Sequence, residues 1–341
     1  MSAPTIRTLS LGAGVQSTAV ALLAAEGAIP TFDAAIFADT GWEPRAVYTH
    51  LDRLEREVLT PAGIPLHRVS SGNIRSDALD PDHRFASMPL HVIGPCQVCG
   101  PEGGVSPGHV YDLSGLVDGK EYSDYTGVCP RCKGSGKQPG MARRQCTSEY
   151  KLKPIKRKVR ELLGYVHPTP VPRGVVAEQA IGISTDEIGR AKDSGIGYLR
   201  SVFPLLDLGM SRADCERYLK SRGWGDTAKS ACVGCPFHGN AQWRHIRDTQ
   251  PEEWADAVDF DHAIRNGSAR ANAAGQELRG QMYLHRSRLP LDQAPIDRVT
   301  AHEWRQLQSS IDDAIADQLM EDGDPDGCSP WTCRSGAPVT A

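Results

Sequence analysis

The chain has 341 residues, of which 40% are hydrophobic, and its formal net charge is −4. This length allows one large domain or two smaller ones, and the negative charge argues against a protein that coats nucleic acid non-specifically. No stretch approaches the roughly 18 apolar residues of a membrane span, and the N-terminus lacks the features of a secretory signal, so we expect a globular cytoplasmic protein that does not bind membranes.

The first ninety residues alternate between predicted strands and predicted helices. Apolar runs at 6–11, 34–39 and 66–69 are typical of buried strands. Segments 17–25 and 44–59 have the apolar spacing of helices that face a core. This alternation predicts an α/β fold of the Rossmann-like kind, in which helices flank an open parallel sheet.

A stretch rich in glycine, proline and cysteine at 91–140 interrupts the alternation. It lacks helical periodicity, so we expect an inserted module whose fold depends on metal rather than on a hydrophobic core. The α/β domain is then expected to comprise 1–90 and 141–240, followed by a helical region at 241–320 and a mobile, cysteine-containing tail at 321–341. The expected later elements are helices at 150–163, 242–247, 251–265 and 301–320, a strand at 175–183, an apolar segment at 204–208, and a helix that Ser211 caps with Asp214 in its first turn.

The stretch LSLGAGVQSTAVALL places a turn of small residues between the first strand and the first helix. In an open α/β sheet, ligands bind beyond the carboxyl ends of the strands, where a helix N-terminus offers backbone N–H groups to an anion. Gly12 and Gly14 allow the backbone to approach closely, and Ser17 and Thr18 add hydroxyl groups. The turn therefore predicts a phosphate or sulfate site, with a close-packed turn that holds no ligand as the alternative.

The cysteine spacing indicates metal chemistry. Ten cysteines in a cytosolic chain favour metal or sulfur chemistry over disulfides. Two CxxC pairs about thirty residues apart in the insertion are typical of a zinc site with four cysteine ligands, and CPRCKGSG resembles the zinc ribbons of the DnaJ chaperones. Such a ribbon serves nucleic acid or protein binding, or is purely structural. The predicted zinc ligands are Cys96, Cys99, Cys129 and Cys132.

Five segments together resemble one family. They are LGAGVQST, FADTGWEPRAVYTHLDRL, CTSEYKLKPIKRKVRE, GISTDEIGRA and ACVGCPFH. In this order they resemble the PP-loop adenine nucleotide alpha-hydrolase superfamily, in its phosphoadenosine phosphosulfate reductase-like branch. The similarity covers residues 5–90 and 143–245, and leaves out the insertion and the last hundred residues.

The resemblance implies a site for ATP or a related adenine nucleotide. The glycine-rich turn would hold the phosphate-like end, and the Asp-Thr-Gly motif would flank the nucleoside. Many PP-loops carry an aspartate where this chain has Gln16, and that carboxylate helps to organise magnesium, so the departure leaves ATP cleavage and magnesium binding open. The residues expected to bind the nucleotide are Ser10, Gly12, Gly14, Gln16, Ser17, Thr18, Asp39, Thr40 and Gly41.

The same resemblance implies a 4Fe-4S cluster, for which this chain offers Cys146, Cys232 and Cys235. Three thiolates leave one iron open to water, hydrosulfide or substrate, as in the cluster-dependent tRNA thiolases. Alternatively Cys328 or Cys333 closes the site. The simpler alternative is that the distal CxxC pair binds zinc or forms a packing turn, and Cys215 is expected to be a buried apolar residue.

Cations near these thiols are candidates for anion binding. The segment 143–160 carries eight cations and one acid, among them Lys151 and Lys153, which either attract an anion or form a solvated helix face. Glu187 and Arg190 occupy the family's substrate-side motif, and Arg190 is the expected clamp for a phosphate or sulfate.

Two enzyme classes follow from these expectations, and a nucleotide-sensing subunit without catalytic activity is a third possibility. The first is an adenylating sulfurtransferase that thiolates a base or makes a phosphorothioate backbone in DNA or tRNA, with a partner protein as sulfur or electron donor. The second is a phosphoadenosine phosphosulfate or adenylylsulfate reductase with a cysteine nucleophile in its tail. The expected catalytic residues are Cys146, Arg190 and Cys333.

Overall fold

The apolar runs form a parallel sheet in the computed structural model, which describes residues 5–83, 88–96, 132–275, 278, 280–301 and 303–305. The sheet has the strand order β3-β2-β1-β6-β7, with every neighbouring pair parallel. β2 reads AAIFAD and is buried along nearly its whole length, because helices cover both faces of the sheet. The predicted α/β, Rossmann-like architecture is therefore confirmed. Its strands are β1 (Ile6–Leu11), β2 (Ala34–Asp39), β3 (Leu66–Ser70), β6 (Ala177–Ile181) and β7 (Leu199–Val202).

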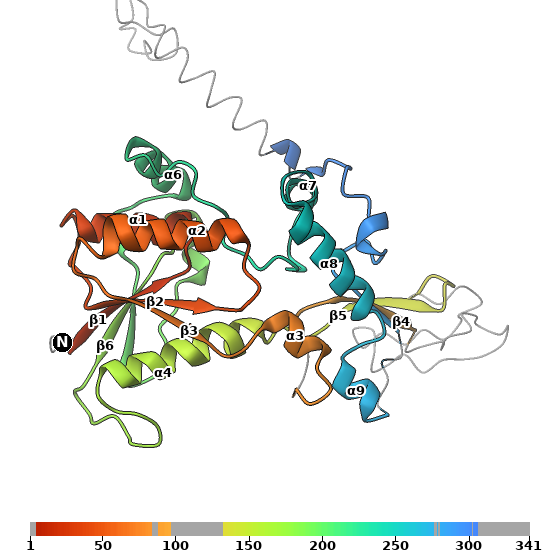
Figure 1. The fold of residues 1–341 in the computed structure, drawn as a ribbon, viewed down its shortest axis with the longest axis horizontal. Coiled ribbons are helices and arrows are strands. Elements are labelled where there is room, and N and C mark those ends of the chain that lie inside the picture. The colour runs from red at the N-terminus through yellow and green to blue at the C-terminus, as the bar shows by residue number, and fades with distance from the viewer. Residues whose placement is uncertain are drawn as a thin grey trace, which may run out of the picture. The chain divides into compact units, whose positions relative to one another are not determined.

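Helices cover the two faces of this sheet (Figure 1). α1 (Val15–Ala25) and α2 (Arg45–Leu54), which a π-helical turn η1 (Glu55–Leu59) extends, pack on one face. α4 (Lys153–Leu162) packs on the other face, where Ile155 and Val159 contact the core around Ile36. None of the helices in the part that the structure describes is long and apolar enough to cross a membrane.

The predicted cap at Ser211 is confirmed. The Asp214 backbone N–H donates to Ser211 Oγ at 3.2 Å, and the Ser211 N–H donates to the Asp214 carboxylate at 2.8 Å, so the two residues form a capping box. The helix they begin, α6 (Arg212–Ser221), packs on α1 through Cys215, which is fully buried. Burial raises the pKa of the Cys215 thiol to about 11, as expected for a cysteine with a packing role.

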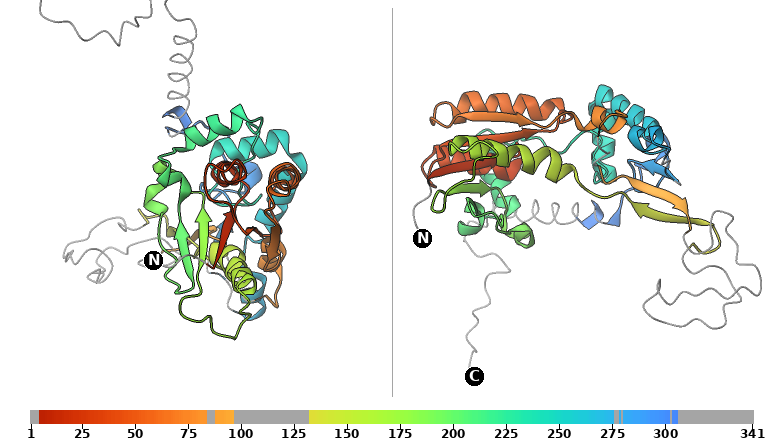
Figure 2. Two further views of the ribbon diagram at one scale, coloured as in Figure 1. Left: turned by 90° about the vertical axis from the view of Figure 1, so that its left-hand side faces the viewer. Right: turned by 90° about the horizontal axis from the view of Figure 1, so that it is seen from below.

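The two ends of the predicted insertion belong to a second, antiparallel sheet. It has the order β5-β4-β8, and Figure 2 shows β4 (His91–Pro95) beside β5 (Lys137–Met141). β8 (Gln281–Tyr283) pairs with β4 and so brings a C-terminal segment into the sheet. These strands were not predicted, because their sequences are short and two of them contain proline. The remaining helical elements are α3 (Ile74–Leu79), η2 (Thr147–Leu152), η3 (Thr185–Arg190), α5 (Pro204–Asp207), α7 (Asn240–Thr249), α8 (Pro251–Ala263), α9 (Ala269–Ala273) and η4 (Leu291–Gln293).

The chain divides into two compact units. The first combines Met1–Phe237 with Pro251–Ala294, and the second combines His238–Gln250 with Pro295–Ala341. In the second unit, the Asn240 amide donates to the carbonyl oxygens of Pro295 and Arg298. Most of the expected helix at 301–320 and the whole tail lie outside the described residues.

A buried histidine beside the small sheet makes stability depend on pH. His285 is 2% exposed, and its Nδ1 accepts from the Ser287 N–H at 3.1 Å. Burial, together with the charges of Arg286 and His91, lowers the pKa of His285 to about 4. Between pH 6.5 and 4, His285 is therefore protonated in the unfolded chain but largely neutral in the folded protein. Its full contribution to the free energy of unfolding is present above pH 6.5 and is lost as the pH falls towards 4.

We expect the urea midpoint to be lower at pH 5 than at pH 7.5, with His285 contributing at most about 1.4 kcal/mol per pH unit. His285→Asn keeps a hydrogen-bond acceptor without the titration and should reduce this pH dependence. Burial also lowers the pKa of His50 and His91, so a smaller dependence should persist. A His285→Asn variant whose stability depends on pH as strongly as that of the wild type would contradict the assignment of this effect to His285.

Candidate nucleotide and thiol sites

The loop between β1 and α1 lies where the sheet order reverses direction. β1 pairs with β2 on one side and with β6 on the other, so crossovers leave their carboxyl ends in opposite directions. Ala13 takes a left-handed φ of 55°, and the Ser17 hydroxyl bonds both the N–H and the carbonyl of Gly14. A Cβ at Gly182, just after β6, would lie 2.8 Å from the Ser17 nitrogen. Glycine at this position therefore lets the end of β6 lie against the N-terminus of α1.

A cleft of about 420 Å³ opens at this point, a volume within the usual range for small-molecule sites. Among the described residues that line it are four cations. Because they share the cleft with a helix N-terminus, it suits an anionic group. The lining comprises Ser10, Gly12, Gly14, Val15, Gln16, Ser17, Lys151, Ile181, Gly182, Glu187, Arg190, Arg212, Lys229 and Ser230.

Gln16 lies in a polar network within the cleft. Its amide nitrogen is 3.4 Å from Glu187 Oε2, and its amide oxygen accepts from Arg212 at 3.4 Å. Arg190, the expected clamp, donates to Glu187 at 2.6 Å. The sequence motifs did not point to Arg212 and Lys229, since both lie outside the family-like segments that suggested the site and come to the cleft only through folding.

Other residues expected to bind the nucleotide or the substrate anion do not line this cleft. Thr18 is fully buried, and its hydroxyl is 2.9 Å from His50 Nε2, so it holds α1 against α2. Lys153 is half exposed and pairs with Glu149. Asp39 accepts from the Gly41 N–H at 2.8 Å and therefore shapes the turn after β2.

That turn lies beside the predicted thiol site, which comprises Cys146, Cys232 and Cys235. Thr40 Oγ1 is 3.2 Å from Cys232 Sγ, although the two residues are 192 positions apart in the sequence. Burial raises the pKa of the Cys232 thiol to about 12, and the charge of Glu43 adds to this effect. Burial also raises the pKa of Cys235. Cys232 is therefore protonated at neutral pH in the absence of a metal.

Lys151 interacts electrostatically with all three candidate cluster cysteines, Cys146, Cys232 and Cys235. Its Nζ lies 3.3 Å from Oε1 of Glu43, whose side chain is completely buried. Burial lowers the pKa of Lys151, but the charges of Glu43 and the thiols outweigh it, and the pKa is raised overall. One ammonium group thus interacts electrostatically with all three cysteines and also lines the cleft.

The distal CxxC loop packs against the turn after β2. The Val233 N–H donates to the Trp42 carbonyl at 2.9 Å. A Cβ at Gly234 would lie 3.0 Å from Trp42 Cζ2 and closer still to two other atoms of the indole ring. The glycine of CVGC is therefore needed for this contact, a requirement that the sequence does not reveal.

The thiols do not form a ready-made site for a single ion. In the part of the chain that the structure describes, no three His, Cys, Asp or Glu side chains could together hold one metal ion. A cluster attaches its thiolates to different irons, so its ligands need not converge on one point. The donor set of three cysteines beside a buried carboxylate and a lysine is compatible with such a group.

The predicted zinc site is described in part. Cys96 follows β4 and Cys132 precedes β5; both are buried, and the Cys96 N–H donates to the Gly136 carbonyl at 2.8 Å. After Cys132, Lys133 and Gly134 have φ values of 51° and 82°, which make a tight turn. One cysteine of each pair thus lies at the base of the insertion. Cys99 and Cys129 lie outside the described residues, as do Cys328 and Cys333.

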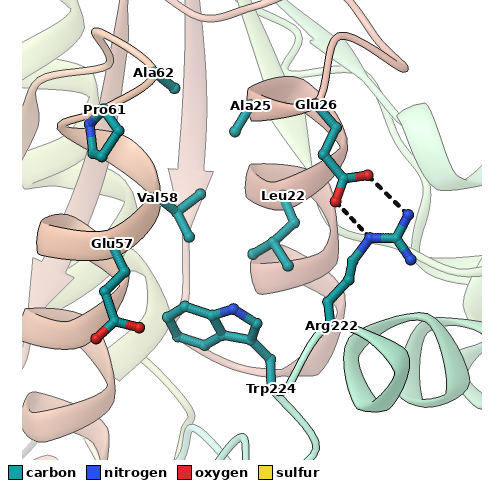
Figure 3. A pocket seen from close by; sticks show the side chains of 9 residues that line it. All are labelled: Leu22, Ala25, Glu26, Glu57, Val58, Pro61, Ala62, Arg222 and Trp224. Carbon is teal, nitrogen blue, oxygen red and sulfur yellow. Dashed lines mark hydrogen bonds and ion pairs between the residues drawn. The ribbon is translucent and has the colours of Figure 1, made fainter.

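A separate groove of about 440 Å³ lies between α1, η1 and the end of α6 (Figure 3). Its charged groups satisfy one another: Arg222 pairs with Glu26, and Glu57 with Arg53. Trp224 supplies an apolar wall. No unpaired charge among the described residues that line this groove points to a ligand, and we assign it no function.

Comparison with known proteins adds no family assignment: no protein-family model matches the chain, and no curated protein is significantly similar to it.

Proposed function

We propose that this protein is a PP-loop enzyme that binds ATP or a related adenine nucleotide and transfers sulfur to a nucleic acid. The observation that carries the proposal is the position of Lys151, which lines the anion cleft and also contacts Glu43 beside Cys232. A negatively charged nucleotide and a sulfur-bearing centre would thus share one cation. That arrangement suits a reaction in which a nucleotide-activated group meets sulfur.

In this proposal the cleft holds the phosphates. The N-terminus of α1 and the side chains of Arg190 and Arg212 would bind phosphate oxygens. An acceptor oxygen attacks the α-phosphate, pyrophosphate leaves, and sulfide then displaces AMP together with that oxygen. Glu187 is the one carboxylate among the described lining residues, and it takes the place of the missing PP-loop aspartate as a candidate magnesium ligand beside Gln16.

The metals in this proposal are assigned by donor chemistry. Cys146, Cys232 and Cys235 would hold an iron–sulfur cluster, which supplies sulfide or electrons when bound. Zinc would be held by Cys96 and Cys132 with the remaining pair of the insertion. DNA or tRNA is the acceptor, and a sulfur or electron donor protein is a further partner.

A second candidate is a reductase of a phosphosulfate nucleotide. The amide of Gln16, which is a poorer magnesium ligand than a carboxylate, favours it, because such an enzyme binds a nucleotide without cleaving ATP. Its nucleophile would be Cys333.

Labelled ATP distinguishes the two candidates. We expect pyrophosphate release that DNA or tRNA stimulates, and Arg212→Gln should weaken ATP binding about tenfold or more. Arg217→Gln is the matched control, because Arg217 lies on the same helix, is largely exposed and pairs with Asp214. Sulfite release from a phosphosulfate would favour the reductase, and equal ATP affinity of Arg212→Gln and wild type would contradict the assigned cleft.

A further inference from the structure

Glu43 has a carboxylate oxygen that the fold leaves unsatisfied. Its side chain is completely buried, and its Oε1 accepts from Thr40 Oγ1 at 3.1 Å and pairs with Lys151 at 3.3 Å. Cys232 Sγ lies 3.7 Å from the same oxygen. Its Oε2 is buried and has no hydrogen-bond partner among the described residues. A buried, unsatisfied carboxylate oxygen is costly, so it calls for an explanation.

The three cysteines of the thiol site leave one position of a four-iron cluster without a protein ligand. The other described cysteines cannot supply it, because Cys215 lies in the core at α6, and Cys96 and Cys132 lie at the β4–β5 hairpin. Glu43 is the buried anionic group that contacts Cys232. Carboxylates are established ligands of non-haem iron.

We propose that Glu43 is the fourth protein ligand of the iron–sulfur cluster, binding through Oε2. The inference depends on the cluster in the proposed function and adds a ligand to it. Thr40 and Lys151 hold Oε1, which fixes the orientation of the carboxylate and leaves Oε2 free for a metal. The ammonium group of Lys151 also offsets part of the negative charge that three thiolates and a carboxylate would bring together.

Anaerobic reconstitution of the full chain with ⁵⁷Fe and sulfide tests the proposal. Mössbauer spectra of the wild type should show one iron distinct from the other three. Glu43→Gln keeps the size and the Thr40 contact but is a poor iron ligand, so the distinct signal should disappear and the iron per chain should fall by about a quarter. Glu43→Cys should restore full iron content with four similar irons.

Two outcomes overturn the proposal while leaving the cluster in place. One is a Glu43→Gln variant with the wild-type spectrum and iron content. The other is a wild-type spectrum of four similar irons that changes in the Cys328→Ser/Cys333→Ser double variant, which would identify a tail cysteine as the ligand. Wild-type protein that takes up no iron would instead remove the cluster from the proposed function, and this inference with it. Circular dichroism of each variant before reconstitution separates a ligand effect from misfolding.

Discussion

Gly234→Ala is expected to lower the free energy of unfolding by about 1–3 kcal/mol and to displace the distal CxxC loop. The added Cβ would overlap the indole ring of Trp42, which cannot easily move. Trp42 is 6% exposed, its ring packs edge-on against Phe260 at 4.8 Å, and its Nε1 donates to Asp256 at 2.6 Å. The backbone of the CxxC loop must therefore shift instead, and Cys232 moves away from Thr40.

Urea unfolding and metal content after reconstitution measure the two effects. Gly197→Ala is the matched control, because a Cβ at Gly197 has nothing within 4 Å and its φ is not left-handed. The control should match the wild type in both measurements. Wild-type stability and metal content in Gly234→Ala would show that the loop does not depend on close contact with Trp42.

Lys151→Met is expected to weaken nucleotide binding and to destabilise the fold. Removing the ammonium group leaves the Glu43 carboxylate buried without its counter-charge. Loss of one partner of a fully buried pair costs about 3–5 kcal/mol, and because the Lys151 side chain is 36% exposed we expect a smaller cost of about 2 kcal/mol. Loss of one cation from the cleft should also weaken nucleotide binding, by about tenfold or more.

The double variant Lys151→Met/Glu43→Gln separates these effects. Glu43→Gln removes the uncompensated charge, so it should restore part of the stability but none of the nucleotide affinity. Lys158→Met serves as control, since Lys158 forms a partly exposed pair with Glu161 on the same helix. Recovery of nucleotide affinity in the double variant would show that Lys151 acts on binding only through Glu43.

Four of the five strands of the central sheet could be predicted from the sequence because their signals are local, whereas β7 (Leu199–Val202) was not among the expected elements. A strand covered on both faces reads as a continuous apolar run, and 6–11 and 34–39 match β1 and β2 residue for residue. The Ser211 cap is equally local, because the hydrogen bonds of a capping box join residues three positions apart. The small antiparallel sheet could not be predicted in this way. Its strand β8 pairs with a segment almost two hundred residues earlier, and its sequence QMY has no strong pattern.

Some features of the candidate site could likewise be predicted from the sequence, and others could not. The glycine-rich turn and the cysteine spacing indicate an anion site and metal chemistry through residue types and spacing alone. The Asp-Thr-Gly segment is expected at the nucleoside, whereas the structure places Thr40 against Cys232. Glu43 was not among the expected site residues, although a carboxylate four residues beyond a buried strand is the one signal that could have drawn attention to it.

The sequence by itself determined the parallel α/β sheet, the turn that opens α1 and the residue types available for binding anions and metals, because these depend on periodicity and on neighbours in the chain. Only the tertiary structure decided that Lys151 lies between the cleft and the thiols, that Glu43 is enclosed beside Cys232, and that Arg212 reaches Gln16. Each of these contacts joins residues more than a hundred positions apart. Burial and pairing at such separations arise from packing, and local sequence patterns carry no record of them.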